Sequence, residues 1–252
     1  MVTVVAQQKG GVGKTTTAAN IGVLLAREGA RVLVVDTDPQ FALTRQLGLE
    51  IRALGVNLVD VLAGRAGAED AIVTGVHGVD VIATGRDLAG IELSLVGELG
   101  RELFLRDALA PVLDGYDDVM IDTPPNLGLL TVNALVLAER VIAPVSAEDE
   151  ESLHGIRELQ RTVGRLAQRL DGPALTIIPI LTRWAPHRIS SRAIEHALVC
   201  EGHTPAMRIP ARSALFARAA ADQIPLAVSD PDSSPAIAYH QLAEQLTAVS
   251  AR

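Results

Sequence analysis

The sequence of 252 residues is poor in three residue types. Its single cysteine, Cys200, excludes an internal disulfide and a metal site built from cysteines. Aromatic residues make up only 2% of the chain, so a core must consist of valine, leucine, isoleucine and alanine. Lysine occurs only at Lys9 and Lys14, whereas the other twenty basic residues are arginines. This scarcity makes the positions of the two lysines informative.

Long hydrophobic runs are also missing. No stretch of about 18 apolar residues is present, so no transmembrane helix is expected. Met1 leads directly into a strand-like segment without the basic and apolar regions of a secretory signal. These absences predict a cytoplasmic protein without stable membrane association.

Apolar segments of strand length alternate with helical patterns along the whole chain, which predicts crossover connections. The predicted strands are 2–6, 31–39, 79–84, 117–125, 140–145, 174–180 and 206–209. The predicted helices are 13–28, 41–47, 58–63, 68–73, 87–112, 127–138, 149–170, 190–201, 212–221 and 234–249. The expected fold is a single α/β domain over residues 1–252, with a mostly parallel twisted sheet flanked by helices on both faces.

The glycine-rich turn KGGVGKTTT, at 9–17, joins the first strand to the first helix. Glycines let successive backbone N–H groups face one anion, and the helix directs its positive end to the same point. Lys14 can reach the β- and γ-phosphates, and the Thr15 hydroxyl can bind Mg²⁺. The strict pattern G-x-x-x-x-G-K-[ST] fails at Gln8, while the variant beginning at Lys9 is satisfied. The predicted nucleotide contacts are Lys9, Gly10, Gly11, Val12, Gly13, Lys14, Thr15 and Thr16.

Three aspartates stand at the ends of predicted strands. Asp122 closes an apolar strand, where a carboxylate can hold a metal-bound water. Asp36 and Asp38 end a neighbouring strand. Either one alone could equally be a helix cap or a turn residue, but the pair beside a phosphate-binding turn favours catalysis. Thr15 and Asp122 are the metal ligands that this pattern itself predicts.

The turn at 9–17, DTDPQ at 36–40 and VMIDTPPNLGLLTVNAL at 119–135 together resemble the deviant-Walker ATPases of the ParA/MinD group. The resemblance is greatest to ParA-type partition ATPases and extends more weakly through most of the chain. It implies a slow ATPase with ATP and Mg²⁺ as ligands.

The resemblance also implies residue roles. Lys14 serves its own nucleotide, whereas Lys9 crosses a homodimer interface to the partner's nucleotide. Asp38 orients or deprotonates the attacking water and Asp36 supports the Mg²⁺ shell, although the sequence alone allows these two roles to be exchanged. Lys9, Lys14, Asp38 and Asp122 are therefore the predicted catalytic residues. Thr182 and Pro210 approximately match the segments that contact adenine.

Charge is unevenly distributed in a chain whose net charge is −8. Residues 157–218 hold ten arginines against four acidic residues. The resemblance to short ParA proteins, which lack an N-terminal helix-turn-helix, implies non-specific DNA binding through such a patch, with phosphate contacts dominating. Solvated helix faces are the competing interpretation. The candidate DNA contacts are Arg183, Arg188, Arg192, Arg208, Arg212 and Arg218.

The predicted function is a nucleoid-associated DNA-partition ATPase. Its ATP-bound dimer binds DNA, and a centromere-binding partner of the ParB type stimulates the hydrolysis that releases it. No obvious arginine finger is present, so control in trans is expected.

The alternative is a MinD-like or other cargo-positioning ATPase on a membrane or protein scaffold. A membrane role needs a basic amphipathic tail, but the stripe Tyr239, Leu242, Leu246 and Val249 is more typical of a core. The acidic stretch at 147–155 departs from the family and could alter partner contacts or dock a basic peptide.

Overall fold

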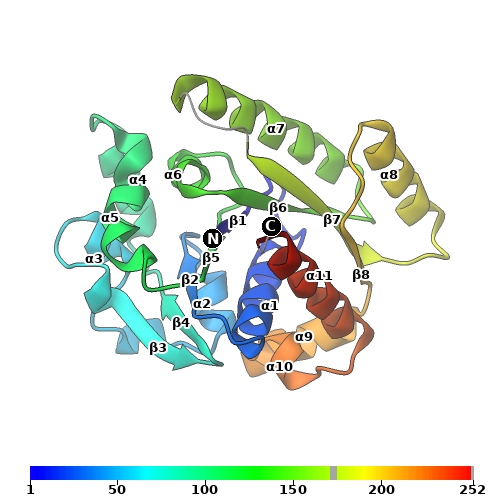
Figure 1. Ribbon diagram of the computed structural model, residues 1–252, viewed down its shortest axis with the longest axis horizontal. Helices are drawn as coiled ribbons and strands as arrows, with labels where there is room; N and C mark the ends of the chain where they lie inside the picture. The colour runs from blue at the N-terminus through cyan, green and yellow to red at the C-terminus, as the bar shows by residue number, and fades with distance from the viewer. Residues whose placement is uncertain (171–174, 251–252) are drawn as a thin grey trace.

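An eight-stranded sheet forms the centre of the protein, with helices on both faces (Figure 1). The structure is a computed structural model that describes residues 1–170 and 175–250. The strand order is β3-β4-β2-β5-β1-β6-β7-β8, and all neighbours are parallel except β3 and β4. The strands are β1 (Val2–Val5), β2 (Val32–Asp36), β3 (Ile72–Val76), β4 (Val79–Ile82), β5 (Asp118–Asp122), β6 (Arg140–Ser146), β7 (Thr176–Trp184) and β8 (Met207–Pro210).

The helices form two layers because successive strand residues point to opposite faces of the sheet. Val4 faces one buried apolar cluster and Val5 faces the other. The α-helices are α1 (Lys14–Arg27), α2 (Ala42–Gln46), α3 (Leu58–Leu62), α4 (Leu88–Leu95), α5 (Phe104–Leu113), α6 (Leu129–Leu137), α7 (Glu151–Leu170), α8 (Ile189–Cys200), α9 (Ser213–Asp222), α10 (Leu226–Ser229) and α11 (Ser234–Ser250). Short 3₁₀ turns are η1 (Ile51–Ala53), η2 (Glu69–Ala71) and η3 (Arg101–Leu103). Helices α1 and α11 pack on one face, and α5, α6 and α7 pack on the other.

The predicted α/β class and the mostly parallel sheet are confirmed, with four local corrections. The helix predicted at 68–73 is the turn η2 followed by β3, which forms an antiparallel hairpin with β4. The helix predicted at 87–112 is divided into α4, η3 and α5, since Gly100 adopts a left-handed φ of 67° between them. The strand predicted at 174–180 runs to Trp184, and residue 174 lies outside the described residues. Helix α10 was not predicted.

The final helix packs its apolar stripe into the protein, as the sequence predicts. Tyr239, Leu242 and Leu246 are buried in the same cluster as α1. The side chain of Val249 lies outside the described residues. Across the ranges that the structure describes, no helix combines the length and hydropathy that crossing a bilayer requires.

The carboxyl ends of β1, β2 and β5 lie together at one edge of the sheet. Asp36 is in register with Asp122, and Val5 is paired with Asp122 on the other side. In open α/β sheets, ligands bind beyond this edge. The predicted glycine turn and all three predicted aspartates therefore meet there.

Candidate functional site

The turn between β1 and α1 forms a phosphate cradle, defined here as residues 10–16. Gly11 and Gly13 have φ angles of 73° and 95°, which side chains other than glycine rarely adopt. Gly13 is also the N-cap of α1, and no side chain caps that helix end. The first N–H groups of α1 are therefore left for a ligand, and the helix dipole favours an anion.

Lys14 extends back over the cradle. Its Nζ donates a hydrogen bond to the carbonyl oxygen of Lys9 at 3.2 Å, and the residue is only 6% exposed. Burial lowers the pKa of Lys14, while the charges of Asp122 and Asp38 oppose this shift. A poorly solvated ammonium group gains more from a bound phosphate than an exposed one does.

Thr15 and Asp122 form the part of the site that fits a magnesium ion. The Thr15 hydroxyl donates a 2.7 Å hydrogen bond to Oδ2 of Asp122. The other carboxyl oxygen, Oδ1, is buried without a hydrogen-bond partner. Burial, followed by the charge of Asp36, raises the pKa of Asp122 well above its ordinary value. A buried, unpartnered carboxyl oxygen beside a threonine hydroxyl suits a cation or its bound water.

The site does not resemble a metal cage made by protein alone. Within residues 1–170 and 175–250, no cluster of three or more histidine, cysteine or acidic side chains could hold a metal ion. Mg²⁺ commonly binds through one or two protein ligands together with substrate phosphates and water. The residues present therefore fit an ion that arrives with a nucleotide.

Asp36 and Asp38 occupy different environments despite their closeness in sequence. Asp36 is fully buried, and its oxygens accept hydrogen bonds from the Asp38 N–H at 3.0 Å and from the Thr44 N–H and hydroxyl at 2.9 and 2.7 Å. Burial raises the pKa of Asp36 to about 6, although the Thr44 hydrogen bonds counteract it. Asp38 instead lines the nucleotide pocket, and its Oδ1 accepts a hydrogen bond from the Gln40 N–H at 2.9 Å. Asp36 thus holds residues 38–44 in place, whereas Asp38 faces the ligand space.

A pocket of about 610 Å³ opens above the cradle. This volume lies in the range of about 300–1,000 Å³ that is usual for small-molecule sites. Thr182 lines it and donates a 2.8 Å hydrogen bond to the Val12 carbonyl, so it supports the cradle itself. Pro210 pairs with Trp184 across β7 and β8, while its neighbours Ile209 and Ala211 line the pocket.

Phe216 and Tyr239 also line this pocket, and sequence reasoning did not select them. Only three phenylalanines and two tyrosines occur in the chain. Their scarcity was the available signal, because an adenine base commonly needs an aromatic or apolar surface to pack against.

Lys9 points away from the pocket, in contrast to Lys14. Its Nζ lies 2.5 Å from Oδ2 of Asp149 and also contacts Glu151. Its side chain is 27% exposed, and Lys9 is not among the residues that line the pocket. Residues 148–151, here called the acidic segment, connect β6 to α7 beside the cradle.

The six arginines predicted to bind DNA do not form one patch. Arg183, Arg188 and Arg212 line the nucleotide pocket. Arg183 donates a hydrogen bond to the Gly11 carbonyl at 3.0 Å, so it lies at the rim of the cradle. Glu148 of the acidic segment forms ion pairs with Arg183 and Arg188.

The other three arginines lie elsewhere. Arg208 forms an ion pair with Glu195 and stacks over Trp184, with 5.8 Å between its guanidinium carbon and the ring centroid. Arg218 pairs with Asp230 at 3.2 Å. Arg192, on α8, is exposed, and its side chain has no partner among residues 1–170 and 175–250. Of the predicted DNA contacts, Arg192 is the one that lies outside the pocket and has no counter-charge in the part of the chain that the structure describes.

The parallel sheet, the glycine cradle at its carboxyl edge and the Thr15–Asp122 pair define a P-loop ATPase. A family model described as an AAA domain matches residues 1–177. The chromosome-partitioning ATPase Soj of Treponema pallidum is 36% identical over 244 residues, covering 96% of this chain and 94% of that protein. The chain belongs to this AAA-domain family of P-loop ATPases and, within it, to the ParA/Soj partition ATPases.

Solved structures share the whole fold. The structure titled cobyrinic acid a,c-diamide synthase from Mycobacterium smegmatis, with an ATP analogue and magnesium, has a TM-score of 0.84 and 34% identity. The alignment covers 98% of this chain and 93% of that chain. The cell division ATPase MinD of Pyrococcus furiosus has a TM-score of 0.79 and 27% identity, with 98% of each chain covered. The predicted family, fold and ATPase class are thus confirmed, with ATP and Mg²⁺ as the ligands of the class.

Proposed function

We propose that this chain is a DNA-partition ATPase in which ATP joins two copies into a dimer. The dimer binds DNA non-specifically, and hydrolysis stimulated by a centromere-binding ParB-type protein releases it. The observation that carries the proposal is the divergence of the two lysines. Lys14 curls over its own cradle, whereas Lys9 leaves the same turn and ends outside the pocket.

Lys9 is well placed for a partner's nucleotide. Its ammonium contacts the carboxylates of Asp149 and Glu151, whose side chains are 38% and 80% exposed, and a phosphate can replace such exposed partners at modest cost. Two facing copies would each bring one such cation to the other's triphosphate. ATP would then act as a removable link between them, because the third phosphate supplies the charge that the second lysine neutralises.

Within each copy, the residues divide the work of phosphoryl transfer. The cradle N–H groups and Lys14 would hold the phosphates, and Thr15 and Asp122 would hold Mg²⁺. When bound, Mg²⁺ neutralises charge on the phosphate oxygens. Asp38, which faces the pocket, would orient or deprotonate the attacking water.

Asp36 receives a different role from the predicted metal shell. Its oxygens already accept three hydrogen bonds from residues 38 and 44. We infer that it fixes the segment that carries Asp38, so its effect on catalysis is one of positioning.

The name of the Soj relative supports partition as the cellular process, and we propose the nucleoid as the place of action. Membrane cycling of the MinD type gains less support, since Tyr239, Leu242 and Leu246 of the C-terminal stripe are buried in the core. DNA contact would fall first on arginines without internal counter-charges, of which Arg192 is the best placed.

Sedimentation velocity with Mg²⁺ and either ATP or ADP tests the dimer. We expect a dimer with ATP alone, and its loss in the Lys9→Ala variant, which should keep nucleotide binding. Co-sedimentation with DNA at low and high salt tests the DNA step. We expect retention with ATP that falls steeply with salt.

Two results would contradict the proposal. One is a monomer that binds ATP and Mg²⁺ without dimerising. The other is ATP-dependent retention on liposomes with none on DNA, which would favour the membrane alternative. Stimulation of hydrolysis by the product of the adjacent open reading frame, compared with an Asp38→Ala control, tests the partner.

A further inference from the structure

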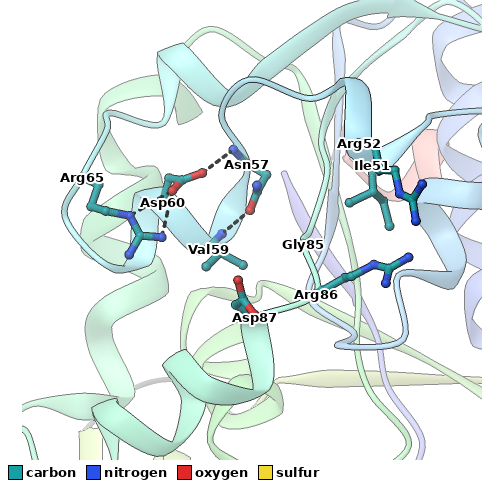
Figure 2. Close-up of a pocket in the computed structure, with 9 residues that line it drawn as sticks. All are labelled: Ile51, Arg52, Asn57, Val59, Asp60, Arg65, Gly85, Arg86 and Asp87. Carbon is teal, nitrogen blue, oxygen red and sulfur yellow. Dashed lines mark hydrogen bonds and ion pairs between the residues drawn. The ribbon is translucent and has the colours of Figure 1, made fainter.

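We propose a second ligand site, separate from the nucleotide pocket, that binds a small molecule bearing a phosphate or carboxylate group. It is a hollow of about 370 Å³ on the N-terminal half of the chain. Its walls are the turn η1, the start of α3 and the connection from β4 to α4 (Figure 2). It shares no lining residue with the nucleotide pocket.

Two arginines without partners identify the site. Arg52 and Arg86 are exposed and have no hydrogen bond, ion pair or ring contact, although most arginines in the described ranges have one. Figure 2 shows both guanidinium groups ending on the same side of the hollow. Two guanidinium groups on one wall match the forked hydrogen bonding of phosphate and carboxylate oxygens.

The remaining charges leave this wall positive. On the opposite side, Arg65 pairs with Asp60 at 2.8 Å, so those two charges compensate each other. Asp87, the N-cap of α4, is the one lining carboxylate without a side-chain partner among the residues described. The lining therefore carries two guanidinium groups and one carboxylate that have no counter-charge among the described residues.

Asp87 also narrows the class of ligand. The Asp87 carboxylate repels an anionic ligand that has no hydrogen-bond donor. It accepts a hydrogen bond from a ligand that also carries a hydroxyl or amino group. A small phosphorylated or carboxylated polyol or amine thus satisfies both walls, and its size fits the hollow.

The shape of the hollow is fixed by a close backbone approach. A Cβ atom at Gly85 would lie 2.9 Å from Oδ1 of Asn57. The same Asn57 oxygen accepts the Val59 N–H at 2.9 Å and caps α3. Gly85 therefore lets the Arg86 connection lie against the capped helix, which holds the two walls together.

The site adjoins the catalytic edge of the sheet. The N–H of Thr84, two residues before Arg86, donates to the Thr44 hydroxyl at 3.3 Å, and Thr44 donates to Asp36. A ligand on Arg86 would therefore bind one short hydrogen-bond chain away from the segment carrying Asp38. The site itself does not depend on the proposed partition function.

Arginine side-chain NMR tests the proposal on the whole chain saturated with ADP and Mg²⁺, so that the cradle is already occupied. The probes are inorganic phosphate and glycerol 3-phosphate, which adds hydroxyl donors. We expect both to shift the Nε–Hε signals of Arg52 and Arg86, with glycerol 3-phosphate binding more tightly. The Arg52→Gln/Arg86→Gln double variant lacks these two signals, so its binding is read from the backbone amide signals of the lining residues Gly85 and Asp87. It should bind at least about tenfold more weakly.

The matched control is Arg169→Gln on α7, which removes another exposed arginine that has no partner among the described residues. It should titrate like the unaltered protein. The Asp87→Asn variant should reduce the preference for glycerol 3-phosphate over phosphate. The proposal is overturned if neither probe shifts the two signals, or if the double variant titrates like the Arg169→Gln control. ADP affinity should be the same in all variants, so a folding defect would be recognised separately.

Discussion

The ammonium nitrogen of Lys9 lies 2.5 Å from Oδ2 of Asp149, within the same chain. The lysine proposed to serve a second copy is thus held by two carboxylates of its own chain. Asp149→Asn removes one of its two carboxylate partners and leaves Glu151 in place. Lys9 then gives up less interaction free energy when it leaves the acidic segment for the partner's nucleotide. The ATP concentration for half-maximal dimerisation should therefore fall by roughly two- to fivefold.

Glu150→Gln is the control for this change, since Glu150 lies in the same segment and its side chain has no partner within the described ranges. Sedimentation velocity across an ATP series measures the effect. Equal behaviour of the two variants would mean that the Lys9–Asp149 contact does not restrain dimerisation.

The same ion pair predicts a pH dependence. Its hydrogen bond from Lys9 lowers the pKa of Asp149 below the ordinary aspartate value. A lowered folded-state pKa means that the contact stabilises the fold above the ordinary carboxyl pKa and is lost as the pH falls through the lowered value. Carboxyl-carbon NMR should show the Asp149 midpoint moving upward in Lys9→Ala. An unchanged midpoint would place Lys9 elsewhere in solution.

How far the sequence predicts the site depends on how local each interaction is. The cradle and Lys14 are encoded in nine consecutive residues, so their arrangement could be predicted. The separation of Asp36 from Asp38 could not, because it depends on Thr44 folding back onto Asp36. Arginine partners are equally hidden, since Glu148 meets Arg188 from forty residues away.

The missed strand β3 has a similar explanation. Residues 72–76 are only partly buried and include Gly75, which has a φ of 73° at an irregular point of the β3–β4 pairing. The segment shows neither a clear alternation of apolar and polar residues nor a continuous apolar run, so its sequence favours a short helix instead. The hairpin depends on the pairing of β3 with β4, and no local pattern within residues 68–73 reveals that pairing.

Asp122 should show opposite effects on stability and function. Asp122→Asn removes a buried charge whose Oδ1 has no partner, so the nucleotide-free protein should become more stable. Each kcal/mol gained would raise Tm by roughly 2–4 °C at this chain length. Mg²⁺-dependent stabilisation by ATP should disappear. Thermal unfolding with and without ATP and Mg²⁺ measures both, and retained Mg²⁺ dependence would exclude Asp122 from the metal site.

Phe216 should contribute to nucleotide affinity through the base. It lines the pocket on α9, and loss of an aromatic stacking surface costs about 1–3 kcal/mol per base. Phe216→Ala should therefore weaken binding of a fluorescent ATP analogue by roughly tenfold. Leu215→Ala, on the same helix but outside the pocket lining, should bind nearly as the unaltered chain does. Equal losses would indicate a general effect on α9.

Ion pairing within the chain ranks the candidate DNA contacts. Arg218 already pairs with Asp230 at 3.2 Å, and a phosphate would have to compete with that carboxylate. Arg192 has no such competitor. Arg192→Gln should therefore lower ATP-dependent DNA retention more than Arg218→Gln, and it should reduce the salt dependence by the equivalent of about one phosphate contact. Retention measured at several salt concentrations separates the slope from the affinity. If Arg218→Gln had the larger effect, the Asp230 pair would have to open on DNA, and internal pairing would be a poor guide to this surface.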